Sequence, residues 1–123
     1  MNISVVIPNY NGEGLLGKNL PKVFEELKSY EKGKTELIVV DDKSEDKSIE
    51  ILNQLSKTYE NLKVFENEKN LGFSSSVNTG VKASNGEIII LLNTDVYPEK
   101  GFLQPLLKNF EDKEVFAVGC LEK

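Results

Sequence analysis

The sequence predicts an α/β fold, with a mainly parallel sheet and helices on both of its faces. Short, β-branched apolar runs, which are typical of strands buried on both faces, alternate along the chain with segments of helical apolar spacing. This alternation indicates parallel strands joined by right-handed helical crossovers. The 123 residues suit one domain and contain no repeat or linker, so we expect residues 1–123 to form a single unit.

Five strands are expected from the apolar runs. The four strongest runs are Ile3–Ile7, Leu37–Val40, Ile88–Leu92 and Val115–Val118, and a weaker one spans Leu62–Phe65. They predict strands near residues 2–8, 35–41, 62–66, 87–92 and 115–119.

Four helices are expected between these strands, near residues 13–30, 45–59, 74–84 and 99–111. One helical face is shared by Leu16, Leu20, Val23, Phe24 and Leu27, and another by Ile49, Leu52, Leu55 and Tyr59. Ser44 is the predicted N-cap of the second helix because two acids follow it, and Pro98-Glu99 suits the start of the fourth. The third helix is predicted to end at Ser84-Asn85-Gly86, through a residue in the left-handed conformation.

Composition excludes several classes of function. A formal net charge of -5 provides no basic surface for a phosphate backbone, so we expect no nucleic-acid partner. Cys120 is the only cysteine and there is no histidine, which excludes a cysteine zinc cluster and leaves carboxylates for acid–base or metal chemistry. An acidic chain can still bind a nucleotide diphosphate if a divalent cation and backbone N–H groups neutralise the charge.

A cytoplasmic location is expected, because a single cysteine cannot form an intramolecular disulfide. The run Ile3–Ile7 is too short for a signal-peptide core, and Ile88–Leu92 is far short of a membrane span. We therefore expect membrane association only through parts of a longer protein. Without such parts, we expect self-association through the exposed sheet.

The residues that follow each strand are the candidate site, because parallel sheets bind ligands at the carboxyl ends of their strands. The run Ile88–Leu92 is followed by Asn93-Thr94-Asp95, which places a carboxylate on a rigid support suited to a metal or ligand. Asp95 is equally compatible with a turn that caps the helix expected near Pro98. The local pattern leaves both interpretations open.

Two adjacent carboxylates, Asp41 and Asp42, follow the second predicted strand. Successive strand residues point to opposite faces, so one of the two is expected to point into a ligand cleft. The structural alternative is that Asp42 caps the following helix through Lys43 and Ser44.

Two further segments combine small and amide side chains. Pro8-Asn9-Tyr10-Asn11-Gly12 offers an aromatic ring and amides that can stack on a base and bond its edges, although it is equally compatible with a simple turn. It has no G-x-G-x-x-G or G-K-[ST] pattern, so neither a dinucleotide-binding motif nor a P-loop is supported. The stretch Asn70–Gly80 would let a ligand approach a helix start closely, but such stretches are more often caps.

Taken in order, these segments resemble the inverting glycosyltransferases of family 2, whose Rossmann-like fold is called GT-A. The matching stretches are Ser4–Asn11, Glu36–Ser44, Asn70–Gly80 and Gly86–Asp95. Their common order and spacing make the resemblance specific. It implies a nucleotide-diphospho-sugar donor, a saccharide or glycolipid acceptor, and Mg²⁺ or Mn²⁺ as cofactor, in the synthesis of cell-surface polysaccharide or glycoconjugate.

The resemblance also implies roles for single residues around the nucleotide. Three of them, Pro8, Asn9 and Tyr10, would lie against the base. Asp42, with Asp41 as its neighbour, would accept a hydrogen bond from the base. The nucleotide and sugar side of the cleft would be lined by Gly72 and Asn78.

The D-x-D motif of the family corresponds to Asn93-Thr94-Asp95, with Asp95 the expected metal contact to the diphosphate. Asn93 replaces the first aspartate, as in rhamnosyl- and related transferases of the family. Because an amide has no negative charge, we expect Asn93 to bond the ribose or sugar, and metal affinity to depend on Asp95 and the diphosphate.

The resemblance covers only the N-terminal half of the family's catalytic domain, so we expect a truncated catalytic domain. No residue here qualifies as the catalytic base, which the resemblance places in the missing half. The isolated chain is therefore expected to bind the donor but to transfer sugar poorly or not at all.

Three other interpretations stay open from the sequence. A non-catalytic nucleotide-binding or interaction module would have the same features. A phosphoacceptor receiver domain has a similar size and an acidic Mg²⁺ site, but its acidic pair follows the first strand and a lysine ends the fifth. A sugar nucleotidyltransferase would need a glycine-rich, arginine-containing loop where this chain has Pro8–Asn11.

Overall fold

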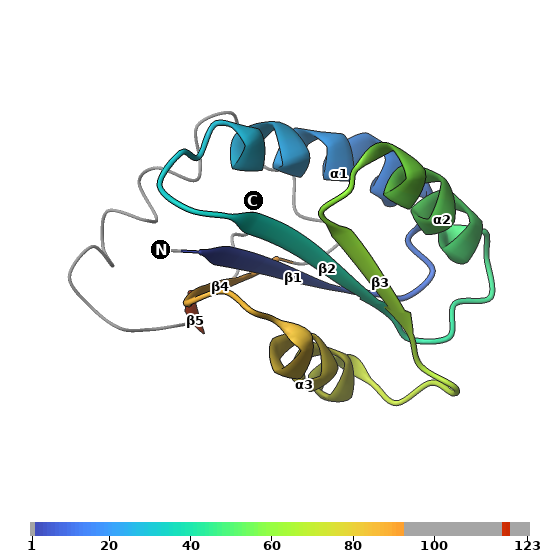
Figure 1. Cartoon of the computed structure of the whole chain (residues 1–123). Helices are drawn as coiled ribbons and strands as arrows, with labels where there is room; N and C mark the ends of the chain where they lie inside the picture. Colours follow the sequence, from blue (N-terminus) through green and yellow to red (C-terminus); the bar gives the residue numbers. More distant parts are fainter. Residues whose placement is uncertain (1, 93–116, 119–123) are drawn as a thin grey trace.

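The structure is a computed structural model that describes residues 2–92 and 117–118. Within these residues one parallel sheet has the strand order β3-β2-β1-β4-β5. The strands are β1 (Ile3–Asn9), β2 (Thr35–Asp41), β3 (Leu62–Glu66), β4 (Ile88–Leu91) and β5 (Ala117–Val118). Two helices, α1 (Glu13–Lys28) and α2 (Ser48–Thr58), cover one face, and α3 (Phe73–Ala83) covers the other (Figure 1). The predicted α/β fold is confirmed.

The strands β1 and β2 are buried on both faces, because successive strand residues point in opposite directions and helices cover both sides of the sheet. Val5 and Ile7 of β1 belong to the larger core, together with the buried faces of α1 and α2. Val6 points to the other face, where it joins Ile38 and Val40 beneath α3. Burial on both faces explains why the strands are continuous apolar runs rather than alternating ones.

The predicted helical faces are confirmed. The five apolar residues expected on one face of α1 are all buried, with Phe24 the most exposed of them at 5%. Leu52 of α2 is buried, and its predicted neighbours on that face pack against the same core. Phe24 stacks on Tyr59 with ring centroids 3.9 Å apart, which joins α1 to the end of α2. Among the described helices none is long and apolar enough to cross a membrane.

One predicted helix start is wrong, and so is the backbone conformation predicted for one helix end. Ser44 is not the N-cap of α2, which begins at Ser48 with Lys47 at the cap position. The Ser44 hydroxyl instead donates to Asp41 Oδ1 at 2.6 Å and accepts the N–H of Asn11 at 2.9 Å, so its oxygen bonds the loop after β1 rather than the start of α2. The third helix ends at Ser84 in an extended conformation, φ -79° and ψ 149°, rather than through a left-handed residue. The predicted helix near 99–111 lies outside the described residues.

A close helix–sheet contact explains one glycine of α3. A Cβ on Gly80 would overlap Cγ1 of Val6 and lie 3.3 Å from Cγ2 of Val40. Gly80→Ala is expected to lower the free energy of unfolding by about 1–2 kcal/mol, since overpacking outweighs the gain in helix propensity. Gly17 of α1 has no atom within 4 Å of such a Cβ. Gly17→Ala should therefore raise the free energy of unfolding by about 0.5–1 kcal/mol. Urea unfolding of both variants measures whether the two changes in free energy have opposite signs. Equal changes in both variants would refute the packing argument.

Candidate functional site

Three strand ends meet at one edge of the sheet. The register aligns Asn9 of β1 with Asp41 of β2, and Asp41 with Glu66 of β3. The Asn9 amide donates to Asp41 Oδ1 at 2.8 Å, and the backbone N–H of Asn67 donates to the Asp41 carbonyl at 2.8 Å. These contacts confirm that the exits of the first three strands are brought together at the carboxyl edge.

The fourth strand ends at the same edge. The N–H of Leu92 donates to the carbonyl of Val6 at 3.0 Å, which continues the β1–β4 pairing to the last described residue before the gap. Asn93 and Asp95, the predicted sugar and metal contacts, lie outside the described residues. Their assignment stays a prediction.

Asp41 lies behind the surface of this edge. Its side chain has no exposed area, and its Oδ2 accepts the backbone N–H of Ser44 at 2.8 Å. Its Oδ1 accepts both the Ser44 hydroxyl and the Asn9 amide. The carboxylate is therefore committed to the chain itself, which favours a structural role for Asp41 over the direct donor contact expected from the sequence.

Asp42 holds the loop that leads into α3. Its Oδ1 accepts the backbone N–H of Leu71 and the amide of Asn67, both at 2.8 Å, and its Oδ2 accepts the N–H of Gly72 at 2.9 Å. Burial raises the pKa of the Asp42 carboxyl, but these bonds and one from Ser76 lower it more, so the pKa lies below its usual value of 3.8. Asp42 is thus ionised at neutral pH. It bonds the loop that leads into α3 and does not cap α2, which was the structural alternative expected from the sequence.

The remaining predicted residues differ in how close they lie to this cluster. Pro8 is part-buried in β1, and Tyr10 directly follows that strand with its side chain 48% exposed. Gly72 bonds Asp42 through its N–H and adopts φ 99°, a conformation that favours glycine. Asn78 is exposed on α3, and helical geometry points it away from Ser76 and Gly80, which face the sheet. The structure therefore does not group Asn78 with the cluster.

Asn67 was expected only as a residue that follows the third strand, and the sequence predicted no role for it in the site. Its amide donates to Asp42 and also to the Ser76 hydroxyl at 3.1 Å, so it connects the end of β3 to both β2 and α3. The available signal was its place directly after the third strand, beside two exits that were selected. A single amide in a polar stretch offered nothing more specific.

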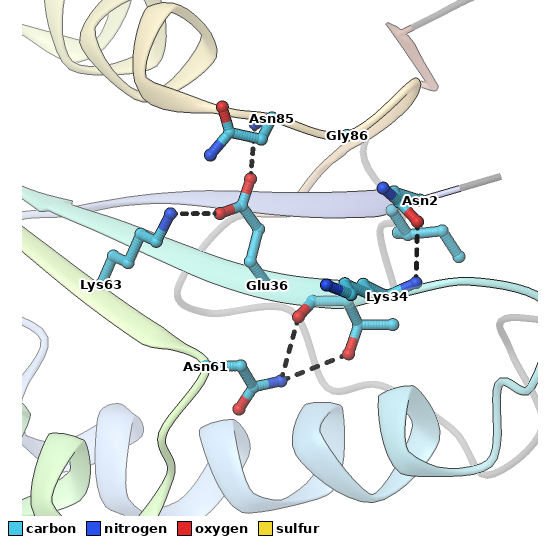
Figure 2. A pocket seen from close by; sticks show the side chains of 9 residues that line it. Asn2, Lys34, Glu36, Asn61, Lys63, Asn85 and Gly86 are labelled. Carbon is cyan, nitrogen blue, oxygen red and sulfur yellow. Dashed lines mark hydrogen bonds and ion pairs between the residues drawn. The ribbon is translucent and has the colours of Figure 1, made fainter.

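A pocket of about 260 Å³ lies at the opposite, amino edge of the sheet (Figure 2). Glu36 is at its centre, 9% exposed, and its carboxylate accepts the Ser4 hydroxyl at 2.5 Å and the Asn85 N–H at 2.6 Å. Lys63 forms an ion pair with it at 2.8 Å. Figure 2 shows the Glu36 carboxylate between the Lys63 side chain and the backbone of Asn85, which indicates that Glu36 stabilises the junction between α3 and β4.

Stability is expected to fall in acid because of this network. Burial raises the pKa of Glu36, but bonds from Lys63, Ser4 and Asn85 lower it more, so the pKa lies below its usual 4.5. A lowered folded-state pKa contributes stability above pH 4.5 that is lost as the pH falls through the folded value. Thermal melts should be flat from about pH 7 to 5 and drop below about pH 4.5. Glu36→Gln should melt lower at pH 7 and approach the parent at pH 3, whereas parallel curves would refute the assignment.

A divalent cation is not accounted for by the described residues alone. Within residues 2–92 and 117–118, no group of three or more Asp, Glu, His or Cys is arranged to hold a metal ion. Asp41 and Asp42 each accept at least three hydrogen bonds from the chain. Asp95, the predicted metal ligand, lies outside the described residues, so the metal site stays a prediction.

Two solved structures with this arrangement contain a bound sugar nucleotide. S. aureus TarS 1–349 in complex with UDP-GlcNAc superposes with a TM-score of 0.76 and 29% identity, over 88% of this chain and 30% of TarS. The mannosyltransferase PcManGT from Pyrobaculum calidifontis, in complex with GDP-Man and Mn²⁺, gives a TM-score of 0.71 and 26% identity, over 77% and 28%. Fold and site together define a Rossmann-like domain of the GT-A transferase class.

The chain belongs to Glycosyl transferase family 2, which matches residues 4–123. A Methanococcus voltae dolichyl N-acetyl-alpha-D-glucosaminyl phosphate 3-beta-D-2,3-diacetamido-2,3-dideoxy-beta-D-glucuronosyltransferase is 32% identical over 111 residues, 89% of this chain and 34% of the relative. A poly(ribitol-phosphate) beta-glucosyltransferase of Bacillus spizizenii is 41% identical over 98 residues, 79% of this chain and 15% of the relative. The chain thus spans about a third or less of the length of these relatives.

Proposed function

We propose that this chain is the donor-binding part of a glycosyltransferase, which moves a sugar from a nucleotide-diphospho-sugar to an acceptor hydroxyl. The observation that supports it best is the cluster at the carboxyl edge, where hydrogen bonds fix Asn9, Asp42 and Asn67 at the strand ends and Tyr10, the first residue after β1, is exposed. Fixed polar groups together with an exposed aromatic residue suit a nucleobase, which offers a face for stacking and edges for hydrogen bonds.

The base is assigned to the loop after β1. Tyr10 stacks on it, while Pro8 and Asn9 shape the adjacent surface. Asp42, ionised and 6% exposed, offers an acceptor for a donor group on the base edge. Gly72 has no side chain, which lets the chain approach the ligand closely. A residue with a side chain would be strained at its φ of 99°.

The diphosphate is assigned to the end of the fourth strand. Asp95 is the proposed ligand of Mg²⁺ or Mn²⁺, and Asn93 the proposed partner of the ribose or sugar. The cation would neutralise the negative charge that grows on the leaving diphosphate. The relative PcManGT was solved with GDP-Man and Mn²⁺, which supports a divalent cation in this class.

The acceptor and the catalytic base are assigned to the part of the relatives that this chain does not span. The acceptor is a saccharide or glycolipid, in the synthesis of cell-surface polysaccharide or glycoconjugate. Two of the relatives named above act on dolichyl phosphate-linked and poly(ribitol-phosphate) substrates, which supports this class of acceptor. The isolated chain is then a binding unit with little or no transferase activity, and its cytoplasmic location stays a prediction.

Calorimetric titration with nucleoside diphosphates tests this proposal. We expect one of UDP, GDP and dTDP to bind weakly without metal and more tightly with Mn²⁺, because the cation offsets repulsion between the diphosphate and an acidic chain. Uridine, guanosine and thymidine are the matched controls, and they should show no response to Mn²⁺. Absence of binding by a folded sample under every condition would count against the donor site.

A further inference from the structure

The loop that contains Tyr10 is bonded to the loop after β2 by two reciprocal pairs of hydrogen bonds. In the first pair the N–H of Asn11 donates to the Ser44 hydroxyl at 2.9 Å, and the N–H of Glu45 donates back to Asn11 Oδ1 at 2.8 Å. These partners lie 33 and 34 residues apart in the sequence, so the bonds form only when β1 and β2 are paired.

The second pair joins the starts of α1 and α2. The N–H of Glu13 donates to Asp46 Oδ2 at 3.0 Å, and the N–H of Lys47 donates to Glu13 Oε1 at 3.0 Å. Each helix start thus has one backbone N–H bonded by an acid from the other loop. The two loops form one unit.

Ser44 is the residue on which the first pair depends. Its hydroxyl has one proton, which it donates to Asp41 Oδ1 at 2.6 Å, and its oxygen then accepts the N–H of Asn11. Asp41 fixes Ser44 twice, since it also accepts the Ser44 N–H, and it fixes Asn9 through the amide. Tyr10 is therefore held on both sides, through Asn9 and Asn11, while its ring stays 48% exposed.

The backbone of Asn11 shows why this bonding is needed. Asn11 has φ 55°, in the left-handed region, which is uncommon for residues other than glycine although Asn adopts it more readily than most. The reciprocal bonds to Ser44 and Glu45 hold it in that conformation. Without them the residue would relax toward the commoner conformations and turn the peptide that follows Tyr10.

We propose that Ser44, held by Asp41, is a positioning residue that orients the ring of Tyr10 for stacking on the nucleobase. This inference rests on the proposed donor site, since it assigns Tyr10 to the base. Ser44 does not touch the donor. It fixes the Tyr10 backbone during folding, so that less conformational entropy is lost when the base binds.

A double-mutant cycle on nucleotide affinity tests the coupling between the two residues. Ser44→Ala should weaken UDP or GDP binding about five- to tenfold, the equivalent of ordering one side chain on binding. Ser44→Thr, which keeps the hydroxyl, should restore most of the affinity. In a Tyr10→Ala background, Ser44→Ala should have no further effect, because the ring that Ser44 positions is gone. The same loss in both backgrounds would overturn the proposal and leave the donor site standing.

A measurement without nucleotide separates this proposal from the donor site itself. Backbone ¹⁵N relaxation of Tyr10 and Asn11 should show increased motion in Ser44→Ala and parent-like order in Ser44→Thr. Ser29→Ala is the matched control, since that hydroxyl bonds Glu26 at the far end of α1. Unchanged order at Tyr10 in Ser44→Ala would overturn the positioning role whether or not the nucleotide binds. Altered order in a chain that binds no nucleotide would overturn the proposed function alone.

Discussion

Asp42→Ala is expected to abolish measurable nucleotide binding and to lower the free energy of unfolding by about 3 kcal/mol. The substitution leaves the N–H groups of Leu71 and Gly72 and the amide of Asn67 without their charged acceptor. Bonds to ionised groups are the stronger ones, and these donors are only partly reachable by water. The loop from Asn67 to Gly72 loses three of its hydrogen bonds and keeps the backbone bond from Asn67 to Asp41, and the donor loses one wall of its site.

Glu45→Ala is the matched control for this prediction. Glu45 lies three residues later in the same loop, and its side chain is exposed. The Glu45→Ala substitution removes the same negative charge as Asp42→Ala. We expect its stability to change by less than about 0.5 kcal/mol. Urea unfolding and calorimetry on both variants make the comparison. Equal small effects would show that the carboxylate of Asp42 does not hold the loop.

Gly86→Ala is the second substitution with a large expected effect. A Cβ at Gly86 would lie 2.6 Å from the backbone nitrogen of Ser4 and 2.8 Å from the carbonyl carbon of Ile3. Because these are backbone atoms of β1, they cannot move aside as a side chain can. We expect a loss of about 3 kcal/mol, at the upper end of overpacking costs. The bond from Gly86 N–H to the Ser4 hydroxyl, 2.8 Å, should be broken in the same variant.

The neighbouring Asn85 is the control for Gly86. Its contact with Glu36 is made by the backbone N–H, and its side chain is exposed, so Asn85→Ala should change stability by less than about 0.5 kcal/mol. Thermal and urea unfolding of both variants measure the difference. A Gly86→Ala protein as stable as the parent would show that β1 and the start of β4 are less closely packed than the structure indicates.

The sheet was predictable from the sequence because its strands are short apolar runs buried on both faces. The order of strands along the sheet was not, because pairing depends on which crossovers lie on which face. Helix faces were also predictable, since Leu16, Leu20 and Leu27 can share a buried face only in a helix. Helix starts were less so: Ser44 is a residue type typical of a cap, but its oxygen accepts the N–H of Asn11, 33 residues away, instead of an N–H of α2.

The sequence was sufficient to predict which strand ends form the candidate site. It was not sufficient to predict which side chains contact one another there. Asp41 and Asp42 are adjacent and chemically identical, and only the fold shows that one bonds Asn9 and Ser44 while the other bonds the loop before α3. The partners of Asp42 lie 25 to 30 residues away. Asn78 was expected in the site because it matches the family motif, but it lies on the exposed side of α3.

The most direct test of the donor site is a map of backbone amide shifts on a ¹⁵N-labelled sample titrated with UDP and GDP in the presence of Mg²⁺. The proposed site predicts that the moving amides cluster in residues 9–12, 42–44 and 67–72, at the carboxyl edge of the sheet. Amides around the amino-edge pocket, such as those of Asn2 and Asn61, should stay in place. Shifts confined to that pocket, or the absence of any shift at saturating nucleotide, would contradict a donor site at the strand ends.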